Sequence, residues 1–213
     1  MFDMTDKSLI TEHDIRSVTS GDVLRVAGKA LVTPLAADLA RERRVTIERA
    51  EAFAGVTGKP KIAIGADHGG FEMKEDLKAC LAEMGFEFQD LGTNSTAVVD
   101  YPDFAEAVAL AVTRGACDLG IMIDGAGIGS CMAANKVPGI RAAMCYDEQT
   151  ARNSREHNGA NVLTLGGKMI SNAQMRLIVR AWLSSSLSEE RHQRRVAKID
   201  ALDGIRGHEK GGQ

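Results

Sequence analysis

The segment IMIDGAGIGS, residues 121–130, places a single carboxylate, Asp124, between an apolar run and a glycine-rich loop. The apolar run is typical of a buried strand. Three glycines follow Asp124 within five positions: Gly125, Gly127 and Gly129. Glycines let backbone N–H groups approach an anion near the start of a helix, so the loop predicts a cradle for a phosphate or a carboxylate. Asp124 stands at the mouth of this loop.

A strand followed by spaced glycines also suggests a dinucleotide-binding fingerprint, and Asp147 follows at about the expected distance. Two features disfavour that interpretation. Ser130 occupies the place of the third fingerprint glycine, and Asp124 would face a pyrophosphate with like charge. A simple turn remains the plain alternative for the loop.

Two histidines occur at positions suited to catalysis or substrate binding. The motif GADHGG places Asp67 and His68 just after a predicted strand, and REHNGAN places His157 at the end of a predicted helix, followed by Asn158. Each histidine taken alone also fits a structural or solvent-facing role. A metal site built from these residues and Asp124 lacks the support of a His/Glu pair at i, i+4 spacing.

The motif ERHQRRV places Arg191 and Arg195 four residues apart on a predicted helix. That spacing puts both guanidinium groups on one face, where they suit a single phosphate. The alternative is an ordinary solvated, charged face.

Strands and helices alternate from Lys61 onward, which predicts an α/β domain. The predicted strands are residues 61–67, 86–92, 118–124, 139–147 and 161–167. The predicted helices are residues 71–85, 100–115, 148–159, 172–185 and 189–202. This alternation predicts a parallel five-stranded sheet with helices on both faces, and sites in such sheets lie at the C-terminal strand ends. Asp67, His68, Asp124 and the glycine loop are therefore expected on one rim.

The first sixty residues differ and are expected to form a small α+β module. Helices are predicted at 11–21 and 33–44, and strands at 22–28 and 45–50. The expected organisation is a module at 1–56, a linker at 57–60, the main domain at 61–203 and a flexible tail at 204–213.

Net charge, apolar runs and cysteine spacing exclude several classes of binding partner. The chain of 213 residues has a net charge of −3, which makes nucleic acid a poor candidate. No apolar run approaches the ~20 residues of a membrane span, and the acidic N-terminus does not resemble a signal peptide. The four cysteines lack paired spacing and predict buried thiols in a reducing cytoplasm.

From about Lys61 to Leu202 the chain resembles the ribose-5-phosphate isomerase B family, which includes the galactose-6-phosphate isomerase subunits. The matching motifs are GADHGGFEMK, DLGT with DYPD, GIMIDGAGIGSCMAANKVPGIRAA, REHNGANVLTLGGKMI and AWLSSSLSEERHQRRV. The resemblance implies a Rossmann-like domain without a nucleotide. It also implies a homodimer or tetramer whose sites use residues from two chains.

The resemblance implies a role for each candidate residue. His157 would help open the sugar ring, and Asp67, His68 and Asn158 would bind sugar hydroxyls. Arg191 and Arg195 would bind the phosphate, supported by Lys168 where many relatives carry arginine. The N–H groups of the loop from Gly125 to Gly129, Gly127 included, would stabilise an enediolate oxygen. Aldose–ketose isomerisation through an enediolate needs one base and an anion cradle, and it needs no metal or nucleotide cofactor.

The chain departs from the family where the base should be. Many relatives have cysteine in place of Asp124 and threonine in place of Ala126, and some have a glutamate base in place of Ser130. One galactose-6-phosphate isomerase subunit has aspartate here and works only with a partner subunit. Asp124 is therefore a replacement base, a structural residue, or the mark of lost or changed chemistry.

We expect an isomerase that converts ribose 5-phosphate to ribulose 5-phosphate with Asp124 as the base. The alternatives are an isomerase of a hexose or deoxy-sugar phosphate and a non-catalytic, partner-dependent binding subunit. The N-terminal segment LITEHDIRS…ALVTPLAADLARERRVTIER resembles leaders of bacterial microcompartment enzymes, such as ethanolamine-utilisation cobalamin adenosyltransferases. An ordinary dimerisation or shielding appendage is the alternative. The expected location is the cytoplasm, either free or within a microcompartment.

Overall fold

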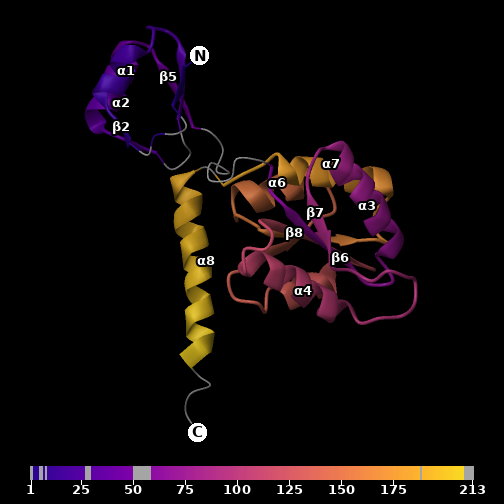
Figure 1. The fold of residues 1–213 in the computed structure, drawn as a ribbon. Coiled ribbons are helices and arrows are strands. Elements are labelled where there is room, and N and C mark those ends of the chain that lie inside the picture. Colours follow the sequence, from indigo (N-terminus) through magenta and orange to yellow (C-terminus); the bar gives the residue numbers. More distant parts are fainter. Residues whose placement is uncertain are drawn as a thin grey trace. The chain divides into compact units, whose positions relative to one another are not determined.

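The computed structural model describes residues 2–4, 7, 9–26, 30–49, 59–187 and 189–208. The chain divides into two compact units, Met1–Gly58 and Lys59–Gln213, which are described separately (Figure 1). Residues 57 and 58, half of the expected linker at 57–60, lie outside the described residues.

The second unit is built on a parallel sheet of five strands in the order β7-β6-β8-β10-β9 (Figure 1). The strands are β6 (Ile62–Ala66), β7 (Phe88–Asp90), β8 (Leu119–Asp124), β9 (Ala142–Met144) and β10 (Val162–Gly166). The predicted five-stranded parallel sheet is confirmed.

Every residue of the three central strands, β6, β8 and β10, is buried. Their near-continuous apolar sequences are those of strands covered on both faces. The register pairs Asp124 at the end of β8 with Gly166 at the end of β10. The glycine loop therefore leaves the sheet at its C-terminal edge, as predicted.

Helices cover both faces of this sheet. They are α3 (Phe71–Glu83), α4 (Tyr101–Thr113), α5 (Ile128–Ala134), α6 (Glu148–Glu156) and α7 (Asn172–Leu183). The last helix, α8 (Glu190–His208), follows them in the chain. α4 packs against α5 and the sheet, whereas α7 contacts α3 and α6 (Figure 1).

Helix α5 is an element that the sequence patterns did not predict. It begins at Ile128, so the second half of the predicted glycine loop is helical. Gly127 precedes it with a φ of 80°, a left-handed conformation that a side chain would strain.

Helix α8 is longer than expected. It continues to His208, past the predicted end at Leu202, so residues 204–208 of the expected flexible tail are helical. Asp200 pairs with Arg141 at 2.7 Å, and Asp203 accepts the Gly139 amide at 2.7 Å. These contacts fasten the helix near its middle. Residues 209–213 lie outside the described residues.

The first unit has its own core, a separate cluster of buried residues that includes Ile10, Ile15 and Leu24. Its strands form two parallel sheets, β1-β3-β5 and β2-β4. The elements are β1 (Phe2–Met4), β2 (Leu9–Ile10), α1 (Glu12–Ser17), β3 (Val23–Val26), β4 (Leu31–Val32), α2 (Pro34–Glu42) and β5 (Thr46–Arg49).

The two predicted helices and two predicted strands of this unit are present as α1, α2, β3 and β5. The three remaining strands have only two or three residues each and were not predicted. In neither unit is a described helix long and apolar enough to cross a membrane.

Candidate active site

The C-terminal ends of three neighbouring strands are fastened to one another. The Asp67 amide, after β6, donates to the carbonyl of Ile123 in β8 at 3.2 Å. The Gly167 amide, after β10, donates to the carbonyl of Asp124 at 2.7 Å. The loops that follow these strands therefore share one small region at the edge of the sheet.

Glycines allow these loops to touch. A Cβ on Gly70 would lie 2.2 Å from the Ile123 carbonyl oxygen, and one on Gly167 would lie 2.8 Å from the Gly69 carbonyl oxygen. Neither position has room for a side chain. This close packing explains why glycine is needed in the motifs GADHGG and LTLGG.

The Asp124 carboxylate is buried in its own loop, with 4% of the residue exposed. Its Oδ1 accepts the amides of Ala126, at 2.8 Å, and of Gly127. Its Oδ2 accepts the Ser130 amide at 2.9 Å and the Ser130 hydroxyl at 2.5 Å. Two acceptor positions on each oxygen are thus filled. The anion held by the glycine loop is the chain's own Asp124.

This arrangement divides the predicted enediolate cradle. The Gly127 amide is committed to Asp124, whereas the Gly125 and Gly129 amides have no hydrogen-bond acceptor among the described residues. The amides that remain for an external oxygen are therefore those of Gly125 and Gly129.

Three residues that the sequence analysis did not single out shape the loop. The Tyr146 hydroxyl donates to the Ala126 carbonyl at 3.0 Å, and the Thr164 hydroxyl donates to the Gly127 carbonyl at 2.9 Å. Tyr101 lies against Gly129, where a Cβ would come within 2.5 Å of its ring. Of these, Thr164 carried a signal, because it is a polar residue inside an otherwise apolar strand.

Asp67 and His68 lie at the same edge as Asp124. Asp67 Oδ1 accepts the amides of Gly69 and Gly70 at 2.8 and 3.0 Å, which leaves Oδ2 directed toward His68, 3.9 Å from its Nδ1. The His68 ring is partly exposed, and its Nδ1 also lies 3.2 Å from the Val99 carbonyl oxygen. Both side chains are therefore held in place by backbone groups.

Lys168 completes this group. Its amide donates to the Gly125 carbonyl at 3.0 Å, and its Cδ lies 3.8 Å from where a Cβ on Gly125 would be. Its side chain is exposed, so its ammonium group is available beside the glycine loop.

His157 and Asn158 lie at the opposite edge of the sheet. α6 begins beyond the C-terminal end of β9 and runs back along the sheet, so His157, its C-cap, precedes the start of β10. The Arg141 guanidinium, before β9, donates to the Gly159 carbonyl at 3.0 Å at this edge. From Val162 to Gly166, β10 alone spans about 13 Å.

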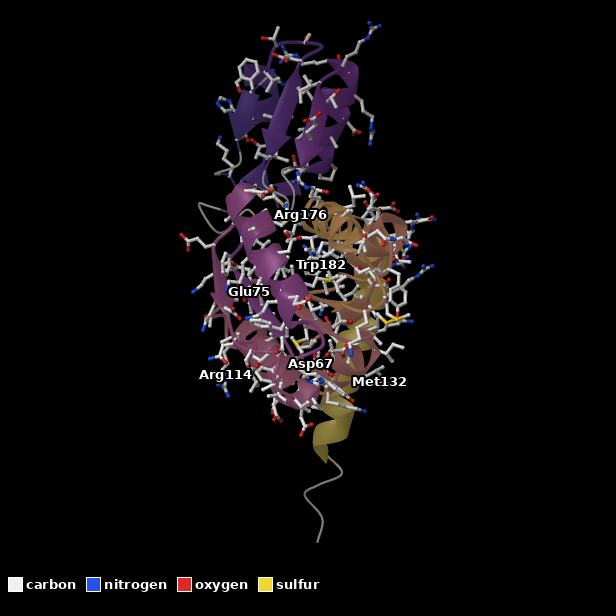
Figure 2. The ribbon with its side chains drawn as sticks, turned by 90° about the vertical axis from the view of Figure 1, so that its right-hand side faces the viewer. Asp67, Glu75, Arg114, Met132, Arg176 and Trp182 are labelled. Atoms are coloured by element: carbon white, nitrogen blue, oxygen red, sulfur yellow. The ribbon has the colours of Figure 1, made fainter. Side chains whose placement is uncertain are left out.

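Trp182, near the end of α7, is labelled apart from Asp67 in Figure 2. The Arg155 guanidinium carbon, two residues before His157, lies 4.9 Å from the centre of the Trp182 ring. Burial there lowers the pKa of Arg155 to about 10.

Arg191 and Arg195 share the edge with His157. The His192 ring stacks on the His157 ring with centroids 4.2 Å apart, and Val196, one turn further along α8, is buried. Arg191 and Arg195 flank this packed face and are exposed, as the shared-face prediction requires.

One chain therefore does not bring all predicted site residues together. The edge at the C-terminal strand ends has Asp67, His68, Asp124, Gly125, Gly127, Gly129 and Lys168. The opposite edge has His157, Asn158, Arg191 and Arg195.

In the described ranges, no cluster of three or more His, Cys, Asp or Glu side chains could hold a metal ion. All four cysteines are free thiols, and burial raises the pKa of Cys145, Cys80 and Cys117.

Comparisons with known proteins agree with this architecture. The Ribose/Galactose Isomerase family model matches residues 62–199. Ribose-5-phosphate isomerase B of Escherichia coli K12 is 46% identical over 143 residues, which cover 67% of this chain and 96% of that protein. A relative in Listeria innocua with the name ribose-5-P isomerase B is 40% identical over 143 residues, 67% of this chain and 97% of its own.

Solved structures give the same result. Ribose-5-phosphate isomerase B of Clostridium thermocellum superposes with a TM-score of 0.68 at 46% identity, over 68% of this chain and 99% of that one. The Mycoplasma genitalium enzyme with bound ribulose-5-phosphate has a TM-score of 0.65 at 41% identity, over 68% and 96%. By sequence and by fold, the chain belongs to the ribose/galactose isomerase family.

Proposed function

We propose that the second unit is an aldose–ketose isomerase that converts ribose 5-phosphate to ribulose 5-phosphate. The observation that carries this proposal is the edge formed by Asp67, His68 and the glycine loop, where the Gly125 and Gly129 amides remain open to an enediolate oxygen. The relatives named ribose-5-phosphate isomerase B support the same activity, because the match covers almost the whole length of each of them.

The sugar and its phosphate would be bound by groups from both edges. Asp67, His68 and Asn158 suit sugar hydroxyls, because they combine carboxylate, imidazole and amide groups. The exposed guanidinium groups of Arg191 and Arg195 suit the phosphate dianion, since each offers a planar fork of donors. Lys168 adds a further positive charge from the other edge.

These two groups of residues require two chains. A pentose phosphate is shorter than the separation of the two edges, so it cannot contact both within one chain. We therefore infer that the site forms where the Asp124 edge of one copy meets the His157 edge of another. A homodimer, or a tetramer built from such dimers, meets this requirement.

Asp124 occupies the place of the base, but all its acceptor positions are filled. Three of its donors are backbone amides that the loop fixes. The fourth is the Ser130 hydroxyl, which can swing away by rotation about the Cα–Cβ bond. If this hydroxyl turns away, Oδ2 gains a free acceptor position. The carboxylate can then remove the proton from C2 of the sugar and return it to C1.

The saturated carboxylate also favours a second candidate. If the Ser130 hydroxyl never releases Oδ2, the chain is a sugar-phosphate-binding subunit that depends on a cysteine-bearing partner. An isomerase of a hexose or deoxy-sugar phosphate is a variant of the first proposal, because the same groups would hold a sugar of different length.

The test is an assay of the purified chain alone against ribose 5-phosphate, with hexose 6-phosphates and a deoxy-pentose phosphate in parallel. Ketose formation from ribose 5-phosphate alone, or fastest from it, supports the first proposal. Binding without turnover for every sugar phosphate would overturn it and support the partner-dependent subunit.

For the first unit we propose an appended module outside the isomerase chemistry, because the family match begins only at residue 62. A microcompartment leader and a dimerisation or shielding appendage remain the two candidates for its role.

A further inference from the structure

Asn153 and His157 lie one turn apart on the same face of α6. The side-chain nitrogen Nδ2 of Asn153 lies 2.8 Å from Nδ1 of His157. Asn153 is exposed and His157 is partly exposed, so a second chain or a substrate can reach them. Residues at i and i+4 are neighbours on a helix surface, which makes this a local contact that the helix itself fixes.

The contact selects one form of the imidazole. The Asn153 amide nitrogen has only hydrogens to offer, so the His157 Nδ1 must accept. A neutral imidazole has one N–H group, and when Nδ1 accepts, the proton is on Nε2. His157 then presents an N–H donor on the side of the ring away from Asn153.

His192 covers one face of this ring. The two imidazoles stack with centroids 4.2 Å apart and planes 17° apart. His192 is 4% exposed, and neither of its ring nitrogens has a hydrogen-bond partner among the described residues. The Oε2 atom of Glu189, three residues before His192, lies 3.8 Å from the Nε2 atom of His192.

Burial lowers the pKa of His192, and the neighbouring His157 and Arg191 lower it further. His192 therefore stays uncharged near neutral pH and does not compete for the proton on His157. It acts as an apolar wall that limits the tilt of the His157 ring.

We propose that Asn153 is a positioning residue that holds His157 in the Nε2–H tautomer, with His192 as the wall behind the ring. The proposal rests on the proposed isomerase function, in which His157 opens the sugar ring. Nε2–H donates a hydrogen bond to the ring oxygen, which takes a proton from water as the bond from C1 to that oxygen breaks. The anomeric hydroxyl loses its proton to water as the C1 carbonyl forms, so the protons balance and the imidazole stays neutral.

The tautomer can be observed directly in the full chain. Long-range 1H–15N NMR correlations distinguish Nδ1–H from Nε2–H imidazoles, and the chain has only five histidines to assign. In the wild-type protein we expect the Nε2–H pattern for His157. In Asn153→Ala we expect a mixture of the two forms. A dominant Nδ1–H form in the wild type, or an unchanged pattern in Asn153→Ala, would overturn the proposal.

Kinetics separate ring opening from proton transfer. Ribulose 5-phosphate cannot form a five-membered ring, because its C5 oxygen is esterified. Exchange of its C1 hydrogen with solvent deuterium therefore reports proton transfer without ring opening. In Asn153→Ala we expect turnover of ribose 5-phosphate to fall about 2- to 10-fold, the scale of one lost hydrogen bond, with C1 exchange unchanged.

Gln149→Ala is the matched control, because it removes an exposed amide one turn earlier on α6. We expect it to change neither rate. Equal losses of turnover and exchange in Asn153→Ala would indicate a merely structural role and overturn the proposal. A wild-type chain inactive in both assays would refute the isomerase function, and the NMR pattern would still decide the role of Asn153.

Discussion

Ser130 donates twice to one oxygen of Asp124, from its amide at 2.9 Å and from its hydroxyl at 2.5 Å. The resemblance to the family implies a base at the Asp124 position or at the Ser130 position. These two positions are hydrogen-bonded to each other here. This pair controls whether the carboxylate has a free acceptor position.

Ser130→Ala removes the hydroxyl and keeps the amide. We expect turnover to be retained or to rise, since Oδ2 gains the free position that a base requires. We expect the free energy of unfolding to fall by about 1.5–3 kcal/mol, the scale of a hydrogen bond to a charged group. Steady-state kinetics and urea unfolding measure the two effects.

Ser130→Thr is the control, because it keeps a hydroxyl at the same place. If Ser130→Ala were inactive while Ser130→Thr remained active, the hydroxyl itself would be needed for turnover. The idea that it merely blocks the carboxylate would then be wrong.

Asp124→Asn keeps the shape of the side chain and removes its basic character. We expect turnover to fall by ~10²–10⁴, typical of the loss of a general base. The amide NH2 would also face donors from the loop, so some loss of stability is expected. Calorimetry should show that sugar-phosphate binding is largely kept.

Asp124→Cys tests the same position from the other direction. A thiol there matches the relatives, and we expect it to retain or restore activity. If the wild-type chain and Asp124→Cys were both inactive alone, Asp124 would not be a replacement base, and the partner-dependent subunit would be favoured.

Arg191→Ala and Arg195→Ala should each weaken sugar-phosphate binding by about 1.5–3 kcal/mol, because each removes a charged fork from the phosphate. The change should appear in KM and in the dissociation constant. Arg194→Ala is the matched control, since it removes another exposed arginine of the same helix that is not proposed to bind the phosphate. If all three variants bind equally well, this part of α8 is only a solvated surface.

The shared site predicts complementation between two inactive variants. Asp124→Asn disables one edge and His157→Asn the other, so a mixed dimer has one site with both changes and one with neither. We expect a mixture of the two proteins, after dissociation and reassociation, to recover a substantial part of wild-type turnover. Mixtures that stay as inactive as their components would place a complete site within one chain.

The architecture of the second unit could be predicted because its signals are local and repeated. Apolar runs such as the one before Asp124 alternate with amphipathic helices, and that alternation determines a parallel sheet. The short strands of the first unit could not be predicted in the same way. β2 has only Leu9 and Ile10, which is too few residues to show a period.

The candidate site was predictable in its residue types and less so in its geometry. The glycine loop indicated a cradle for an external anion, and in the structure two of its amides bind the carboxylate of Asp124 instead. That Asp124 itself occupies it depends on a side-chain conformation and on α5 beginning at Ile128. Neither follows from spacing. The contact between His157 and His192 likewise depends on how α8 packs, which a charged helix pattern does not reveal.

The separation into two units leads to the last prediction. A chain that begins at Thr57 removes the first unit, whose core residues form a cluster of their own. We expect this shortened chain to fold, to unfold cooperatively and to keep whatever turnover the full chain has, because every residue proposed for the site lies beyond it. Circular dichroism, light scattering and the ribose 5-phosphate assay compare the two chains. An insoluble shortened chain, or one with a different oligomeric state, would show that the first unit is structural. The appendage would then contribute to assembly, and a role limited to targeting would lose its basis.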